Sequence, residues 1–146
     1  MVSRTLSKSY ALAGLRFGYL VAHPEIVQTL RKVKDSYNTD ALSIAGATAA
    51  IDDQTWLREN VQRCNATRDR MTVKLRELGF DVIPSEANFV WCTHAECRAE
   101  PLYQQLKQNG LLVRYMNYPR WNDGLRIRVG TDSSIDAMLS LLKSFV

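Results

Sequence analysis

Residues 5–19 read TLSKSYALAGLRFGY and carry most of the chemically distinctive side chains of this 146-residue chain. Lys8 lies between Ser7 and Ser9, small residues follow, and Arg16 comes eight positions after the lysine. A lysine amine can form a Schiff base with an aldehyde, while hydroxyl and guanidinium groups bind phosphate. The pattern suits a phosphate-bearing aldehyde, although a surface lysine in a serine-containing turn gives the same sequence.

The flanking sequence predicts a strand followed by helices. β-Branched and aromatic residues predict a strand over residues 15–21, and Pro24 begins a helix with one apolar face. An alanine-rich helix is expected over residues 40–53, and a 3.6-residue apolar period predicts a long helix over residues 56–78, ended by Gly79. The strand has no evident partner in this half of the chain, so we expect the half to need more sheet from elsewhere.

After Gly79 the sequence predicts a small α+β unit. Short apolar runs indicate strands, and stretches with one apolar face indicate helices. The expected strands cover residues 80–83, 88–92, 111–114 and 125–129, and the expected helices cover residues 101–109 and 133–145. Residues 118–121 form an expected loop between two strands, either beside a substrate or as a packing plug.

Residues 5–19 are very similar to the cofactor-lysine segment of the class I and II aminotransferases of the aspartate aminotransferase superfamily, which use pyridoxal 5'-phosphate (PLP). They resemble most the histidinol-phosphate aminotransferase branch. The resemblance implies that Lys8 binds PLP covalently and later moves the proton between the substrate α-carbon and the cofactor. It also implies that Thr5, Ser7 and Arg16 bind the cofactor phosphate.

Two later motifs extend the resemblance along the chain. Residues 85–90 (SEANFV) are similar to the family segment that begins a small-domain strand, where Asn88 is either a substrate ligand or an ordinary strand residue. Residues 124–131 (GLRIRVGT) resemble the family element whose first arginine, here Arg126, clamps the substrate α-carboxylate. That bidentate task is one that lysine performs poorly.

Two other arginines belong to this expectation. Arg114 corresponds to the family position that helps to bind the substrate's own phosphate in histidinol-phosphate enzymes; the alternative is a solvated arginine at a strand end. Arg128 lies two residues after Arg126 and therefore shares its face of a strand. Geometry leaves the carboxylate clamp open between these two, and only the family register favours Arg126.

The resemblance implies an α/β fold that is the C-terminal part of a PLP-dependent transferase. Residues 1–54 would be the remnant of the large PLP-binding domain, and residues 55–146 would hold a long connecting helix and the small α+β domain. In the family, the acid that protonates the pyridine nitrogen and the Asn and Tyr on the phenolic oxygen lie upstream of the lysine. We therefore expect the isolated chain to be inactive or weak in turnover.

The expected activity is amino transfer between histidinol phosphate and 2-oxoglutarate in histidine biosynthesis. One alternative is another PLP enzyme of the branch, such as a threonine-phosphate decarboxylase or an aromatic aminotransferase. The other is a truncated, non-catalytic module that binds PLP or dimerises. The expected partners are an amino acid and a keto acid, with either a second copy of the chain or a complementing large-domain segment.

Composition excludes several other classes of protein. The net charge of +4 comes from scattered residues, without the clustered basic face of a nucleic-acid-binding module. The apolar stretches are too short to cross a membrane. The three cysteines have no metal-ligand spacing, and their odd number without a signal sequence favours a reducing compartment, the cytoplasm. The two histidines, His23 and His94, are expected at the surface.

Overall fold

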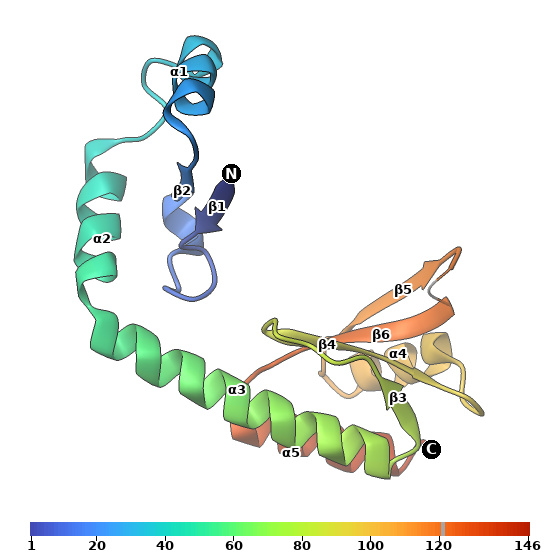
Figure 1. The fold of residues 1–146 in the computed structure, drawn as a ribbon. Helices are drawn as coiled ribbons and strands as arrows, with labels where there is room; N and C mark the ends of the chain where they lie inside the picture. The colour runs from blue at the N-terminus through green and yellow to red at the C-terminus, as the bar shows by residue number, and fades with distance from the viewer. Residues whose placement is uncertain (121) are drawn as a thin grey trace. The chain divides into compact units, whose positions relative to one another are not determined.

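The first strand expected from the sequence has a partner. The computed structural model describes residues 1–120 and 122–146, and the chain divides into two units, Met1–Val61 and Gln62–Val146 (Figure 1). In the first unit, β1 (Val2–Thr5) pairs antiparallel with β2 (Gly18–Val21). The expectation of an unpartnered strand was therefore wrong.

The strand β2 is also shorter than the strand expected over residues 15–21, because residues 13–15 form a 3-10 helix, η1 (Ala13–Leu15). Arg16 follows with φ 53°, in the left-handed region, so β2 cannot start before the backbone has turned. Gly18 begins β2 because a Cβ there would lie 2.8 Å from the carbonyl oxygen of Arg4 on β1. Pairing between these strands thus requires glycine at this position.

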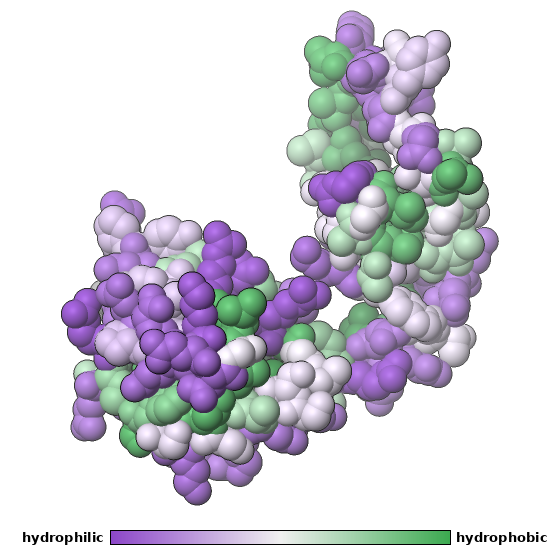
Figure 2. All heavy atoms as spheres, turned by 180° about the vertical axis from the view of Figure 1, so that it is seen from behind, coloured by the Kyte–Doolittle hydropathy of each residue, from purple (hydrophilic) through white to green (hydrophobic). Residues whose placement is uncertain are grey.

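Two helices complete the first unit, and both were predicted. Helix α1 (Pro24–Val33) starts with its proline, and α2 (Ala41–Asp52) starts at the side chain of Asp40, which accepts the Ser43 amide at 2.8 Å. The Ser43 hydroxyl donates to the Leu15 carbonyl, joining α2 to η1. Figure 2 shows apolar side chains at the surface of this unit. The exposed apolar residues here include Val2, Val21, Val33, Leu42 and Ile44.

The long helix α3 (Gln54–Glu77) spans the boundary between the units and confirms the predicted period. Gly79 ends it with φ 86°, donating its amide to the Arg76 carbonyl. Among the described residues, no helix is both long and apolar enough to cross a membrane.

Within residues 62–120 and 122–146, an antiparallel sheet has the strand order β3-β4-β6-β5 (Figure 1). Its strands are β3 (Phe80–Val82), β4 (Phe89–His94), β5 (Arg114–Tyr118) and β6 (Asn122–Arg128). The remaining helices are α4 (Ala99–Gln108) and α5 (Asp132–Lys143), close to their predicted bounds.

The prediction of a strand over residues 111–114 was wrong, because β5 begins only at Arg114. Gly110 has φ 77°, and the Leu111 amide returns to the Leu106 carbonyl, so the chain is still closing α4 where the strand was expected. Leu111 and Val113 pack against the core from this connection instead. In the expected loop over residues 118–121, β5 extends to Tyr118, and Trp121 lies outside the described residues.

One face of the sheet is buried under α3, α4 and α5. The buried side chains come from alternate strand positions and from one face of each helix: Phe80, Val82, Val90, Cys92, Leu125 and Ile127 from the strands, and Met71, Leu75, Leu102, Leu106, Ile135, Met138 and Leu142 from the helices. The intervening strand residues lie on the other face. That face carries the polar and aromatic side chains of the candidate site.

Candidate functional site

Lys8 lies in a loop whose two ends are held by main-chain hydrogen bonds. The amide of Leu6 donates to the Phe17 carbonyl at 3.2 Å, and the amide of Leu12 donates to the Leu6 carbonyl at 3.1 Å. Leu6 is fully buried, while Lys8 is exposed. Within the loop, the Ala11 amide donates to the Lys8 carbonyl at 3.0 Å. The lysine is therefore presented at the surface by a closed turn with a buried anchor.

Two hydroxyl groups and one guanidinium accompany the lysine. The Thr5 hydroxyl lies 3.0 Å from the Ser7 hydroxyl, and the Ser7 amide donates to the same Thr5 oxygen at 3.1 Å. Arg16 donates from Nη1 to the Ala13 carbonyl at 2.8 Å, which leaves its other N–H groups for further partners. The segment thus gathers the donor groups that a phosphate accepts from.

The charge of this segment is uniformly positive. The first acidic residue of the chain is Glu25, and in the described structure neither Lys8 nor Arg16 forms an ion pair with a carboxylate. An amine, two hydroxyls and an unneutralised guanidinium fit a ligand that has both an aldehyde and a phosphate.

The second group of predicted residues lies on the open face of the sheet in the other unit. Arg126 on β6 is paired in register with Arg114 on β5 and with Trp91 on β4. The Arg126 guanidinium lies 4.5 Å from the centre of the Phe89 ring, a cation–π contact. In the part of the chain that the structure describes, no carboxylate neutralises either arginine. Two cations at paired positions on one face of the sheet are suited to an anionic ligand.

Asn88 lies immediately before β4 and is half-buried. Its carbonyl accepts the Val129 amide at 2.9 Å, which extends the β4–β6 pairing by one step. The preceding turn is closed by Ser85, whose hydroxyl donates to the Phe89 carbonyl at 2.6 Å and accepts the Ala87 amide at 3.1 Å. The structure thus pairs Arg114 with Arg126 and places Asn88 at the start of β4, three residues before Trp91, the β4 partner of Arg126.

Arg128 differs from Arg126 although both lie on one strand. It is paired with Phe89, is exposed, and lines a hollow of about 330 Å³ beside Gly130 and the first turn of α5. Arg126 is half-buried and is the one that faces Arg114 across the sheet.

Sequence reasoning missed three residues that shape this face. Phe89 and Trp91 supply its aromatic surface, and Gly124 gives the indole room, since a Cβ at Gly124 would lie 2.3 Å from Trp91 Cζ2. Alternation along β4 places Phe89 and Trp91 on one face, and that signal could have found them. Arg68 was also missed, because a charged residue on an amphipathic helix is ordinarily solvated, yet this one is buried.

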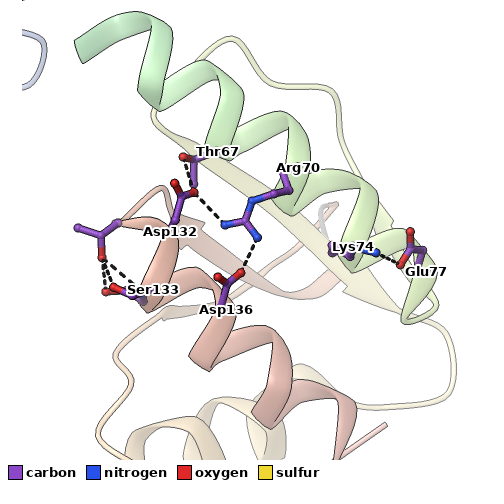
Figure 3. Close-up of polar contacts among 9 residues, drawn as sticks. Thr67, Arg70, Lys74, Glu77, Asp132, Ser133 and Asp136 are labelled. Atoms are coloured by element: carbon purple, nitrogen blue, oxygen red, sulfur yellow. Dashed lines mark hydrogen bonds and ion pairs between the residues drawn. The ribbon is translucent and has the colours of Figure 1, made fainter. Parts of the chain in front are cut away.

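The remaining polar clusters of the second unit have structural roles. Arg70 on α3 donates to both Asp132 and Asp136 on α5, and Asp132 also accepts from Thr67 (Figure 3). Burial raises the pKa of the Cys92 thiol to about 12. Among the described residues, no group of His, Cys, Asp and Glu could hold a metal ion.

His94 is held by the main chain rather than exposed as a free surface residue. Its Nδ1 accepts the amides of Glu96 and Cys97, and its Nε2 lies 3.2 Å from the Leu78 carbonyl. The ring also contacts Phe80 edge to face. These contacts tie β4 to the end of α3, which is a structural task.

Comparison with known proteins places these features in a family context. Residues 1–142 match the family model "Aminotransferase class I and II". The chain is 58% identical over 142 residues to a histidinol-phosphate aminotransferase of Rhodopirellula baltica, covering 97% of this chain and 39% of that protein. It is 43% identical over 146 residues to a histidinol-phosphate aminotransferase of Microcystis aeruginosa, covering 42% of it.

A solved structure shows the same fold. The histidinol-phosphate aminotransferase of Sinorhizobium meliloti, determined in complex with pyridoxal-5'-phosphate, superposes with a TM-score of 0.87 at 26% sequence identity. The match covers 99% of this chain and 41% of that one. The chain thus spans about two fifths of the length of the relatives it matches.

Proposed function

This chain belongs to the class I and II aminotransferase family, and we propose that it supplies the cofactor lysine and the substrate arginines for amino transfer between histidinol phosphate and 2-oxoglutarate. The observation that carries the proposal is the anchored loop that exposes Lys8 in one short segment with the Thr5 and Ser7 hydroxyls and with Arg16, none of them paired with a carboxylate among the described residues. A second copy of the chain, or a complementing large-domain segment, is the proposed protein partner.

Lys8 would hold PLP through its Nζ, and Thr5, Ser7 and Arg16 would bind the cofactor phosphate. When bound, PLP withdraws electrons from the substrate carbon whose proton is removed. Lys8 Nζ would take that proton from the substrate α-carbon and deliver it to the cofactor. The hydroxyls and the guanidinium would meanwhile fix the phosphate, and thereby orient the cofactor ring relative to Lys8.

Arg126 would bind the α-carboxylate of glutamate with two parallel hydrogen bonds. Arg114, its neighbour across the sheet, would bind the phosphate of histidinol phosphate, and Asn88 would contact the substrate from the start of β4. Two observations favour Arg126 over the exposed Arg128 as the carboxylate clamp. Arg128 lines the hollow beside α5, and Arg126 pairs directly with Arg114.

The domain assignment and the cellular location are part of the same proposal. Residues 1–54 would belong to the large PLP-binding domain and residues 55–146 to the small domain. The three cysteines are free thiols, which supports a reducing compartment, the cytoplasm.

The decisive experiment replaces the matching segment of the Rhodopirellula baltica protein with this chain, giving a hybrid called here the graft. The graft should transfer the amino group of histidinol phosphate to 2-oxoglutarate, measured as glutamate formed. The Lys8→Ala graft should bind PLP without a stable covalent bond, so that borohydride no longer fixes the cofactor, and should lose turnover by several orders of magnitude. A folded graft without amino transfer would refute the proposal.

Substrate competition separates the other activities of the branch. Threonine phosphate should yield no carbon dioxide with the graft, and aromatic amino acids should be poor amino donors. Decarboxylation faster than amino transfer would instead support the decarboxylase alternative. Covalent PLP binding with neither reaction would support a non-catalytic module.

A further inference from the structure

Arg68 is a buried cation in the middle of α3, which is unusual for a charged residue on a helix. Its residue exposure is 6%, and its guanidinium contacts two other residues of α3. Nη1 donates to Asn65 Oδ1 at 3.2 Å, and Nε donates to Asp69 Oδ1 at 3.2 Å. These hydrogen bonds hold the planar guanidinium group against α3 in the second unit.

The remaining contacts of Arg68 reach the turn that precedes β4. Nη1 also donates to the Ala87 carbonyl at 3.4 Å, and Nη2 lies 3.8 Å from Glu86 Oε2. Among these contacts only the Ala87 carbonyl belongs to the backbone of another element. Arg68 thus joins α3 to residues 85–88.

That turn leads directly to the candidate substrate residues. Ala87 is followed by Asn88, whose carbonyl accepts the Val129 amide at 2.9 Å. The next residue, Phe89, has its ring 4.5 Å from the Arg126 guanidinium. A shift of the Ala87 carbonyl would therefore move both the start of β4 and the aromatic surface on which Arg126 lies.

Stability is a poor explanation for burying this arginine. Its two carboxylate partners are largely in water, with side-chain exposures of 70% for Asp69 and 98% for Glu86. Removing Arg68 would leave no buried carboxylate uncompensated, and a well-packed apolar residue often replaces a buried cation without loss. The geometry instead favours a role in fixing the turn.

We infer that Arg68 is a positioning residue that sets the pose of Asn88 and Phe89, and through Phe89 the pose of the Arg126 clamp. The inference rests on the proposed function for its effect on substrate, but its structural part can be tested in the 146-residue chain without any substrate. No contact between Arg68 and substrate is involved.

The test compares Arg68→Met with Arg68→Lys and with Arg76→Met as the matched control. Arg76 lies on the same helix and also donates to a backbone carbonyl, that of Val82 at 3.0 Å, on a strand without proposed site residues. By NMR, Arg68→Met should speed amide hydrogen exchange at Val129 at least about tenfold and shift the Phe89 ring signals. Arg76→Met should do neither.

In the graft, Arg68→Met should raise the KM for glutamate about five- to tenfold while kcat changes less than about twofold, because a misplaced clamp weakens ground state and transition state alike. Arg68→Lys should recover part of the loss, since it keeps the charge but not the planar fork. Unchanged Val129 exchange in Arg68→Met would overturn the inference whatever the activity. An inactive wild-type graft would instead refute the proposed function. If Arg76→Met raised the KM as much as Arg68→Met does, Arg68 would be a stabilising residue and not a positioning residue.

Discussion

Arg114 and Arg126 are direct partners across the β5–β6 ladder, so two cations face one another on the open side of the sheet. Like charges directly opposite on neighbouring strands are destabilising. The cation–π contact with Phe89 eases the cost for Arg126 only in part. An anion bound at either arginine would lower this repulsion, which fits the proposed binding of the glutamate carboxylate by Arg126 and of the substrate phosphate by Arg114.

The first prediction concerns the clamp. In the graft, Arg126→Gln should raise the KM for glutamate roughly tenfold to a hundredfold, because a charge-assisted hydrogen bond contributes about 1.5–3 kcal/mol. Arg128→Gln, its matched control on the same strand face, should change KM less than about twofold. Steady-state kinetics decide between the two arginines, and a larger effect from Arg128→Gln would assign the clamp to that residue.

The second prediction concerns the cofactor phosphate. Arg16→Gln should weaken binding of PLP to the graft about tenfold or more, since a charge-assisted contact is lost. The binding of pyridoxal, which lacks the phosphate, should be weakened much less by the same substitution. Arg4→Gln is the control, because Arg4 lies on β1 of the same unit and its side chain donates to the Ser3 carbonyl at 3.4 Å. Equal losses for both ligands in a cofactor titration would remove Arg16 from the phosphate site.

The third prediction tests the close approach of Trp91 to β6. Gly124→Ala should destabilise the chain by about 1–3 kcal/mol, because its Cβ cannot be accommodated without moving the indole. Gly130→Ala is the control in the same motif, since its Cβ would meet Ser134 at an ordinary 3.5 Å. Urea unfolding measures both, and comparable stability of the two variants would show that Trp91 moves aside freely.

The fourth prediction concerns acid stability. Hydrogen bonds from Arg70 and then Thr67 lower the pKa of Asp132 below its usual 3.8 (Figure 3). Because the folded pKa is the lower one, the stabilisation is complete above the ordinary pKa and is lost as pH falls through the folded value. Asp132→Asn should therefore lower the urea midpoint at pH 6, while the midpoints of wild type and variant should converge as pH falls below the folded pKa, which is lower than 3.8.

High salt should reduce the difference in urea midpoint between wild type and Asp132→Asn at pH 6. The ion pairs of Arg70 with Asp132 and Asp136 are partly solvent-exposed and are therefore screened by salt. Asp81→Asn provides the control, since Asp81 is exposed and forms no ion pair in the described structure. A difference in urea midpoint between wild type and Asp132→Asn that does not decrease at all across the acid range would mean that the effect does not come from the ionised carboxylate.

The fifth prediction concerns the thiols. Burial raises the pKa of Cys92 to about 12, so at pH 8 only on the order of one thiol in ten thousand is the reactive thiolate. Iodoacetamide should label Cys64 and Cys97, which are half-buried, long before Cys92. Peptide mass spectrometry with and without urea measures the order, and rapid labelling of Cys92 in the native chain would contradict its burial.

The sequence by itself determined the elements whose signals, such as an apolar period or a terminal glycine, lie within one short continuous segment. The apolar period of α3 and its end at Gly79 follow from helix geometry and from the freedom of glycine at positive φ. The residues of the Lys8 loop were likewise recognisable, because their chemistry and their family resemblance lie in one continuous segment. The length of the strand that follows was wrong.

Tertiary structure decided what depends on partners far apart in the chain. The β1–β2 pairing and the position of Arg126 opposite Arg114 both depend on strand register, which no local period specifies. The burial of Arg68 depends in the same way on a turn 19 residues away. The sequence determines the chemistry of each side chain, but packing between elements determines which side chains come into contact. In a sheet, a shift of one residue in register moves a side chain to the opposite face.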